Sequence, residues 1–317
     1  MTEFNRYKTY SLQVLRMADP PGPQFYVKDL IPEGVTVIAG PPKHAKSWMG
    51  LQLCVAVASG GTALGAFEVK KSKSLYFALE DNAGRLNQRM KQLMSDEEWP
   101  PDCFFQLGIQ ANEMLSDPVK HLDSLLQEVD ASFIVIDTMS RFMLAVPKKR
   151  DVNAYYVEYA MMEPFQTYAL EKHVAVVFIH HFSKRENTND VFERFSGTQA
   201  ISGGADNLVG IVRAPAGITV ATQGRDIGRN EWPAEFDMST GLWTVHTGEY
   251  HVDITKEQFK VLEVLGKGGS TGMFPEAVAK QLRKSDDAAR KLLYRLERDG
   301  KVEKTPYNTY KVKETIV

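Results

Sequence analysis

The sequence predicts an α/β fold in which a mostly parallel central sheet is flanked by helices, followed by a small C-terminal domain of different construction. Short apolar runs of strand length occur at Val35–Ala39, Ser74–Leu79, Ser132–Ile136 and Val174–Ile179, and segments with helical spacing of apolar residues follow the first three. Strands that alternate with helices are typical of a parallel sheet. After Val252 the pattern changes to closely spaced amphipathic helices, which indicates a second domain.

The composition is that of an ordinary globular protein. The chain has 317 residues, of which 43% are hydrophobic and 25% charged, enough for one large domain and a smaller one. No apolar run approaches membrane-spanning length and the N-terminus lacks a signal-peptide core, so we expect a cytoplasmic protein with no membrane partner. Cys54 and Cys103 provide neither a metal cluster nor a disulfide framework.

The stretch from Gly34 to Ser59 has the order strand, loop, helix. Its loop and the first residue of the helical run are Gly40, Pro41, Pro42, Lys43, His44, Ala45, Lys46, Ser47 and Trp48. This is the order of a P-loop, whose backbone N–H groups and following helix N-terminus hold the β- and γ-phosphates. Lys46 is expected to reach the phosphates as a positive charge, and the Ser47 hydroxyl to bind Mg²⁺. We therefore predict ATP and Mg²⁺ as cofactors.

Ala45 departs from the usual P-loop pattern G-x-x-x-x-G-K-[ST], which has glycine at this position. Alanine is the smallest replacement, yet the loop must still bring an amide close to a phosphate. The alternative is an ordinary strand-to-helix turn that ends by chance in Lys46-Ser47. The order of elements and the acids further along the chain favour the P-loop.

Two acids stand at the ends of predicted strands. Glu80 follows Ser74–Leu79, and Asp137 follows Ser132–Ile136. Because the carboxyl ends of parallel strands form the ligand crevice, both carboxylates should face the phosphates. Asp137 is the candidate Walker B acid, which would hold Mg²⁺ through water, and Glu80 is the candidate for activating the attacking water. The neighbouring Asp81 or Asn82 is explained as a helix N-cap.

Two histidines and one arginine are further catalytic candidates. His180 and His181 follow the strand Val174–Ile179, and only one of them can face the nucleotide because neighbours in a strand point in opposite directions. That histidine would sense the γ-phosphate, unless it is a structural residue. Arg225 follows a predicted pair of strands and is either a surface charge or an arginine finger that reaches the ATP of a neighbouring subunit.

Two polar loops, Ala145–Asn153 and Ser183–Asp206, are candidates for gripping single-stranded DNA. The second is long for a connection within a compact domain, which favours a functional role. Contacts to the DNA backbone would be sequence-tolerant and sensitive to salt. The basic residues of the two loops are Lys148, Lys149, Arg150, Lys184, Arg185 and Arg194.

The segment from Val252 to Val317 predicts three helices and a β-hairpin, the composition of a winged-helix domain. Ser285–Asp299 is the recognition-helix candidate. The segment has 14 Lys and Arg against 10 Asp and Glu, so it is the basic part of the chain. Because this excess is modest, contacts with a subunit or protein partner are the alternative to DNA. The candidate phosphate contacts are Lys284, Arg290, Lys291, Arg295 and Arg298.

With these residues in place, the chain resembles the RecA-like AAA_25 ATPases, the group that includes the hexameric plasmid replication helicase RepA. The segments that carry the resemblance lie between about Phe25 and Val245 and read FYVKDLIPEGVTVIAGPPKHAKSW, LYFALEDNAGRLNQRM, FIVIDTMSRF, VVFIHHFSK, FSGTQAISGGADN and GRD. The resemblance implies a RecA-like ATPase domain at residues 34–247, after a lead-in at residues 1–33 and before a winged helix at residues 252–317.

The resemblance also implies roles for single residues. Gly40 to Ser47 would bind ATP and Mg²⁺, Glu80 would be the catalytic base, Asp137 the Walker B acid, and one of the two histidines the sensor. RepA-type helicases place an arginine finger just before the glycine matched here by Gly197, where this chain has Ser196. Arg194 and Arg225 are therefore the remaining finger candidates.

Together these features predict an ATP-dependent DNA translocase or helicase. It is expected to form a homo-oligomer, namely a hexamer, and to hydrolyse ATP at the subunit interfaces. Its expected setting is the replication of a plasmid, phage or mobile element. The alternative is an ATP-switched initiator or regulator that binds duplex DNA through the winged helix without unwinding it. A small-molecule P-loop kinase is a third possibility, but we find neither a lid with clustered arginines nor a second-substrate pocket.

Overall fold

The computed structural model describes residues 4, 8–95, 98–108, 118–144, 154–181, 203–214, 217–247, 256–268, 272–298 and 301–313. Within these ranges, no helix combines the length and the apolar character needed to cross a membrane.

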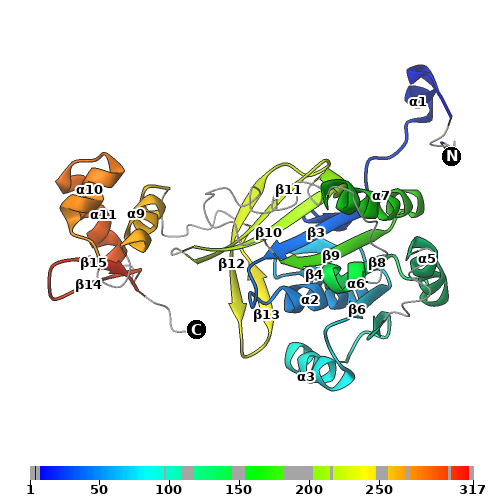
Figure 1. Ribbon diagram of the computed structural model, residues 1–317, viewed down its shortest axis with the longest axis horizontal. Helices are drawn as coiled ribbons and strands as arrows, with labels where there is room; N and C mark the ends of the chain where they lie inside the picture. The colour runs from blue at the N-terminus through cyan, green and yellow to red at the C-terminus, as the bar shows by residue number, and fades with distance from the viewer. Residues whose placement is uncertain are drawn as a thin grey trace.

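A nine-stranded sheet forms the centre of the described structure (Figure 1), in the order β13–β12–β11–β10–β3–β9–β8–β6–β7. The parallel strands are β10 (Asn207–Ala214), β3 (Gly34–Gly40), β9 (Ala175–His181), β8 (Phe133–Asp137), β6 (Ser74–Ala78) and β7 (Cys103–Gln106). The antiparallel extension consists of β11 (Gly217–Gly224), β12 (Asn230–Asp237) and β13 (Leu242–Val245). The prediction of a mostly parallel sheet is confirmed.

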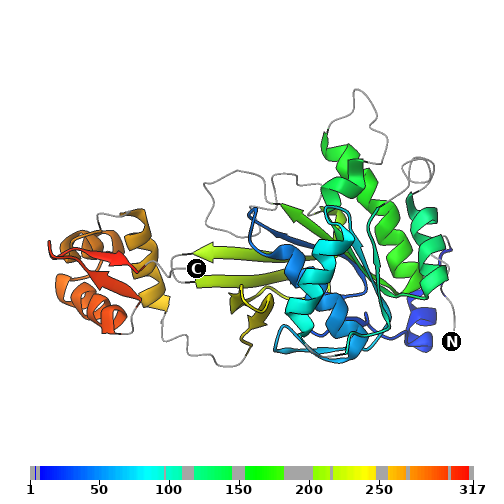
Figure 2. The same cartoon turned by 90° about the horizontal axis from the view of Figure 1, so that it is seen from below.

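Helices cover both faces of this sheet (Figure 2). On one face lie α2 (Lys46–Ser59) and α3 (Ala83–Met94), and on the other α5 (Pro118–Val129), α6 (Met139–Leu144) and α7 (Ala154–Lys172). Successive strand residues alternate between the two cores: Ile38 packs on the side of α2, and Val37 on the side of α7. Burial on both faces explains why the parallel strands are continuous apolar runs in the sequence.

A second, four-stranded sheet has the order β2–β1–β5–β4. Its strands are β1 (Phe25–Val27), β2 (Ile31–Pro32), β4 (Gly61–Ala63) and β5 (Phe67–Val69). The end of the predicted lead-in is thus part of the packed body, and the Tyr26 hydroxyl donates a hydrogen bond to the His173 carbonyl at 2.6 Å. The preceding helix α1 (Leu12–Ala18) buries none of its residues. This sheet and α1 were not predicted.

The C-terminal segment forms a unit with a hydrophobic core of its own. It consists of α9 (Lys256–Lys267), α10 (Pro275–Leu282), α11 (Asp286–Arg298) and a hairpin of β14 (Val302–Lys304) and β15 (Tyr310–Val312). Its core includes Val261, Leu265, Val278, Leu293 and Val302. The predicted helices and hairpin are all present within the described residues.

Candidate functional site

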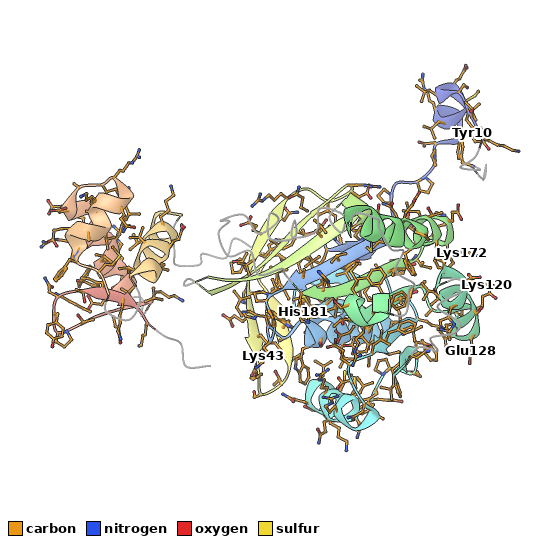
Figure 3. All side chains as sticks on the ribbon, viewed as in Figure 1. Tyr10, Lys43, Lys120, Glu128, Lys172 and His181 are labelled. Carbon is orange, nitrogen blue, oxygen red and sulfur yellow. The ribbon has the colours of Figure 1, made fainter. Side chains whose placement is uncertain are left out.

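Four neighbouring strands end at the same edge of the central sheet and bring the predicted site residues together. The register aligns Ile38 of β3, Ile179 of β9, Asp137 of β8 and Ala78 of β6 side by side. The phosphate loop, the two histidines, Asp137 and Glu80 therefore all lie at the carboxyl edge of the sheet. Figure 3 labels Lys43 of the loop and His181 at the end of β9.

Lys46 begins α2 and is folded into the loop that precedes it. Its side chain is only 4% exposed, and its Nζ donates hydrogen bonds to the carbonyl oxygens of Gly40 at 3.0 Å and Pro41 at 2.6 Å. Burial lowers the pKa of Lys46 to about 8, although the nearby carboxylates of Asp137 and Glu80 act in the opposite direction. At neutral pH the loop therefore carries a positive charge that two carbonyls hold in position.

Asp137 is buried at the end of β8 and has one oxygen engaged and one free of protein partners. The Tyr76 hydroxyl donates to Oδ2 at 2.6 Å, while Oδ1 is buried without a hydrogen-bond partner. Burial raises the pKa of Asp137, and the Tyr76 hydroxyl and the nearby Ser47 hydroxyl partly oppose this rise. A carboxylate oxygen with no protein partner beside a serine hydroxyl fits Mg²⁺, which is usually bound by one or two protein groups together with phosphates and water.

Glu80 lies two residues after the end of β6 and is exposed to solvent. Its Oε1 accepts a hydrogen bond from the Thr138 hydroxyl at 3.0 Å, so the neighbouring strand helps to orient the carboxylate. The adjacent residues have other roles: the Asn82 side chain caps α3 by accepting from the Arg85 N–H at 3.0 Å, and Asp81 forms ion pairs with Arg85 and Arg89. The prediction that Asn82 is a helix cap is confirmed.

The two histidines occupy the last positions of β9. They align with Ala39 and Gly40 of β3, and both have a buried Nδ1 without a hydrogen-bond partner. Burial lowers the pKa of His180 to about 4, helped by His181 and Lys46. Burial and Lys46 also lower the pKa of His181, whereas Glu80 and Asp137 raise it. Both imidazoles are therefore neutral at pH 7, and His181 is the one that lies within the field of the two acids.

Ala45, at the position usually held by glycine, adopts the left-handed conformation with φ 49° and ψ 27°. For a residue with a Cβ this conformation costs roughly 1–2 kcal/mol. The Ala45 carbonyl accepts a hydrogen bond from the Trp243 indole Nε1 at 3.0 Å. The Gln52 side chain holds the Trp243 backbone through two hydrogen bonds, at 2.8 and 3.0 Å. Strand β13 thus fixes the strained peptide in place.

We expect Ala45→Gly to raise the free energy of unfolding by about 1 kcal/mol, because glycine adopts a positive φ without steric strain. The measurement is thermal unfolding of the nucleotide-free protein. Ala56→Gly, in the C-terminal half of α2, is the matched control and should be destabilised by about 1 kcal/mol. A loss of stability in both variants would contradict a strained Ala45.

Arg225 lies at the opposite edge of the sheet from the phosphate loop. Its guanidinium pairs with Asp206 at 3.2 Å, and the other oxygen of Asp206 accepts from the Val35 N–H at 2.9 Å, near the start of β3. Arg225 therefore contributes nothing to the phosphate loop of its own chain. Its role as a finger for a neighbouring subunit stays a prediction.

The predicted DNA contacts fall into two groups. Lys148, Lys149, Arg150, Lys184, Arg185 and Arg194 lie outside the described residues, as do Ser196 and Gly197. In the C-terminal unit, Lys291 and Arg295 are exposed, Arg290 is paired with Glu276, and Lys284 is half-buried. The site at the carboxyl edge includes none of these residues.

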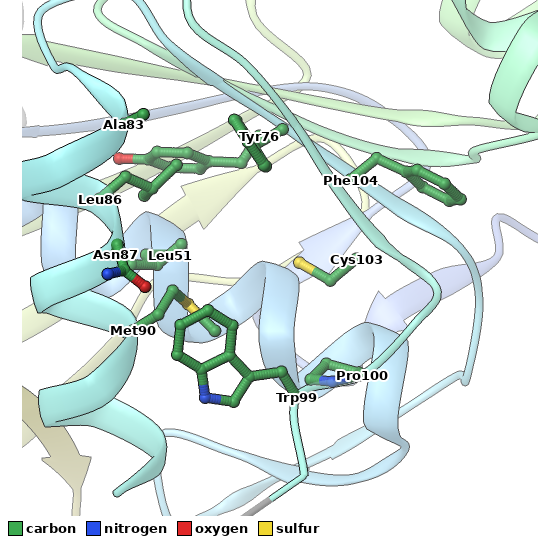
Figure 4. Close-up of a pocket in the computed structure, with 11 residues that line it drawn as sticks. Leu51, Tyr76, Ala83, Leu86, Asn87, Met90, Trp99, Pro100, Cys103 and Phe104 are labelled. Atoms are coloured by element: carbon green, nitrogen blue, oxygen red, sulfur yellow. The ribbon is translucent and has the colours of Figure 1, made fainter.

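Sequence reasoning missed three residues that shape the site: Tyr76, Thr138 and Trp243. Tyr76 lies inside an apolar strand and is only 1% exposed, so it resembles an ordinary core residue. Its ring also forms part of the wall of an apolar cavity of about 350 Å³ between α3 and β7 (Figure 4). Thr138 carried the better signal, because it directly follows the Walker B candidate.

The comparison with protein families agrees with this geometry. The chain matches the family model AAA_25, described as an AAA domain, over residues 5–187, which is more than half of its length. No curated protein matches the chain. The matched region contains the phosphate loop, Glu80, Asp137 and both histidines. The chain therefore belongs to the AAA_25 family of P-loop ATPases.

Proposed function

We propose that this protein is a ring-forming, ATP-driven DNA translocase or helicase of the RepA type. The observation that carries the proposal is the convergence of Lys46, Asp137 and Glu80 at the carboxyl edge of one parallel sheet, in a chain that belongs to an AAA family. These are a phosphate-binding cation, a metal-binding acid and an exposed base, the groups that nucleotide hydrolysis requires.

In the proposed reaction, the backbone N–H groups of the loop and Lys46 hold the β- and γ-phosphates. Ser47 and Asp137 would hold Mg²⁺, which neutralises charge on the phosphates when it is bound. Glu80, oriented by Thr138, accepts a proton from the attacking water. His181 is the better sensor candidate of the two histidines, because the fields of both Glu80 and Asp137 reach it.

We propose further that the C-terminal unit is a winged helix that brings the protein to nucleic acid. Three helices with a hairpin and a separate core support this assignment. ATP would lie between subunits of a homo-oligomer, and an arginine of the neighbouring subunit, Arg194 or Arg225, would complete the site.

The test is ATP turnover with and without single-stranded DNA, combined with particle mass with and without nucleotide. A translocase should show stimulated turnover and a nucleotide-dependent larger particle. ATP turnover that is not changed by DNA, in a protein that stays a monomer with nucleotide, would overturn the proposal.

The second candidate function is an ATP-switched initiator or regulator. The basic C-terminal unit favours it, since such a unit can bind duplex DNA without any motor activity. Tight binding to one duplex sequence, without ATP-dependent unwinding of a forked substrate, would select this function over the first.

We expect nucleotide binding to weaken as the pH rises above about 8. In the ligand-free protein the pKa of Lys46 is lowered to about 8, so above this pH the side chain is increasingly neutral. The phosphates bind the charged form of Lys46, so above this pH the side chain must take up a proton when the nucleotide binds. The affinity for nucleotide then falls by up to about tenfold per pH unit. Equilibrium titration with a fluorescent ATP analogue between pH 7 and 9.5 measures this. The Lys46→Arg variant keeps its charge over this pH range, so its nucleotide affinity should not change with pH. An equal loss of affinity with pH in the variant and in wild type would contradict the role of Lys46 in phosphate binding.

We expect Tyr76→Phe to raise the Mg²⁺ concentration needed for half-maximal ATP turnover by about tenfold, because groups that orient a metal ligand typically contribute 10- to 100-fold in affinity. The substitution removes the hydrogen bond to Asp137 Oδ2 and leaves the ring in place. Tyr168→Phe, whose hydroxyl bonds to Asp123 on the outer helices, is the control and should keep the wild-type Mg²⁺ dependence. Equal Mg²⁺ curves for all three proteins would show that Tyr76 has no such role.

A further inference from the structure

The C-terminal unit carries the two most exposed aromatic side chains among the described residues. Tyr294 on α11 is 65% exposed, and Tyr307 in the turn between β14 and β15 is 82% exposed. The inner side of α11 is occupied by Ala289, Leu292, Leu293 and Leu296, which pack into the core of the unit. Neither tyrosine belongs to the core of the unit, and both are largely exposed to solvent.

Basic residues accompany Tyr294 on the outer side of α11. Lys291 and Arg295 are exposed and lie one turn apart, on either side of Tyr294 in the sequence. The whole segment from Val252 to Val317 carries 14 Lys and Arg against 10 Asp and Glu. The outer side of α11 thus combines an aromatic ring with positive charge, a combination that suits an anionic polymer with stacked bases.

The start of α10 contacts both the hairpin and α11. Met273, just before α10, exchanges two backbone hydrogen bonds of 2.9 Å with Tyr310 of β15. Glu276 in the first turn of α10 forms an ion pair with Arg290 of α11. The start of α10 therefore contacts both the hairpin and the turn of α11 that precedes Tyr294.

The N-terminal turn of α11 is poorly suited to reading duplex DNA. A recognition helix places its first residues against base edges in the major groove, close to the phosphates. Here those residues are Asp286 and Asp287, both exposed and acidic, and the charge of Arg290 is already paired with Glu276. Like charges would repel the phosphate backbone at this end of the helix.

We propose that the C-terminal unit binds a single strand of nucleic acid, with Tyr294 and Tyr307 stacking on bases and Lys291 and Arg295 contacting the phosphate backbone. The proposal rests on that part of the proposed function in which nucleic acid is the partner, and it does not depend on ATP hydrolysis. Recognition by stacking tolerates any sequence, because every base has a flat face.

The test is fluorescence anisotropy of the full-length protein, without nucleotide, with a labelled thymidine oligonucleotide, a ribose strand of the same length and a matched duplex. Tyr294→Ala and Tyr307→Ala should each weaken single-strand binding by roughly 5- to 100-fold, as expected for loss of one stacked base. Tyr294→Phe and Tyr307→Phe keep the rings and should bind like wild type. Phe105→Ala removes an exposed aromatic ring of the main body and should also bind like wild type.

Salt dependence separates the charged residues from the rings. Lys291→Gln and Arg295→Gln should each reduce the slope of log affinity against log salt by about 0.7, whereas the tyrosine variants should keep the wild-type slope. Binding of either the deoxyribose or the ribose strand supports the proposal and identifies the ligand. Alanine variants that bind as tightly as wild type, or tighter binding to duplex than to single strand, would overturn it.

The outcome can be separated from that of the proposed function. ATP turnover without nucleic acid is measured in parallel and should be the same in the tyrosine variants as in wild type. If turnover depends on Lys46 but the alanine variants keep full single-strand affinity, the present inference fails and the ATPase assignment stands. If ATP turnover is absent but the alanine variants lose single-strand affinity, the ATPase assignment fails and the present inference stands.

Discussion

Replacement of Lys46 by alanine should lower ATP turnover by at least about 100-fold, the effect of removing one preorganised positive donor from a developing phosphate charge. Lys46 is buried in the loop, and the carbonyls of Gly40 and Pro41 hold its ammonium group in position. Nucleotide affinity should fall as well, because the ammonium contacts phosphates in the ground state. The measurements are steady-state phosphate release and equilibrium binding of a fluorescent ATP analogue.

The fold should survive this substitution. Burial disfavours the charged form of Lys46, as its lowered pKa shows, so its removal does not take away a net stabilising group. Thermal unfolding of the variant should therefore stay close to wild type. Lys91→Ala, an exposed lysine on α3, is the matched control and should turn over ATP normally. Turnover that persists in Lys46→Ala would disprove the phosphate-loop assignment.

Glu80→Gln should lower kcat by roughly 100- to 10,000-fold and leave nucleotide binding intact, because general-base catalysis contributes about this much. The amide has the shape of the carboxylate and can still accept the hydrogen bond from Thr138, but it cannot take a proton from water. Single-turnover kinetics with pre-bound ATP would show the loss in the chemical step itself.

Glu68→Gln provides the control for this experiment, since Glu68 lies on β5 and pairs with Lys28 at the surface. Its kcat should equal that of wild type. A Glu80→Gln variant with normal kcat would assign the base to another residue. A Glu80→Gln variant that no longer binds nucleotide would instead show that Glu80 contributes to nucleotide binding in the ground state.

The parallel sheet could be predicted because buried strands leave a strong signal. The runs ending at Ala78 and Asp137 are apolar on both faces, and polar residues mark where they emerge. Strand β12 was missed because Asn230–Asp237 mixes charged residues with Pro233 and has no apolar alternation. Its pairing with β11 and β13 determines its conformation, which is tertiary information. Helix α1 was missed for a similar reason, because its seven residues show no core-facing pattern.

The candidate site could be predicted where its residues follow strand ends, and not where they act across the sheet. The convergence of Lys46, Glu80 and Asp137 at the carboxyl edge could be predicted from their positions in the sequence. The role of Tyr76 could not be predicted, because a tyrosine in an apolar run is typical of a core residue. Its hydroxyl donates a hydrogen bond to Asp137, which lies on another strand 61 residues further along the chain. Arg225 shows a second limit of the sequence. It follows a strand, but its position in the sequence does not reveal at which edge of the sheet that strand ends.

The contact between Trp243 and the Ala45 carbonyl gives this protein an intrinsic optical probe. The chain has four tryptophans. Trp48 directly follows Ser47, and Trp243 is hydrogen-bonded to the loop itself. Indole emission responds to local polarity and to nearby charge, so filling the loop with a triphosphate changes the surroundings of two of the four emitters. Occupancy of the pocket can thus be followed in the unlabelled molecule.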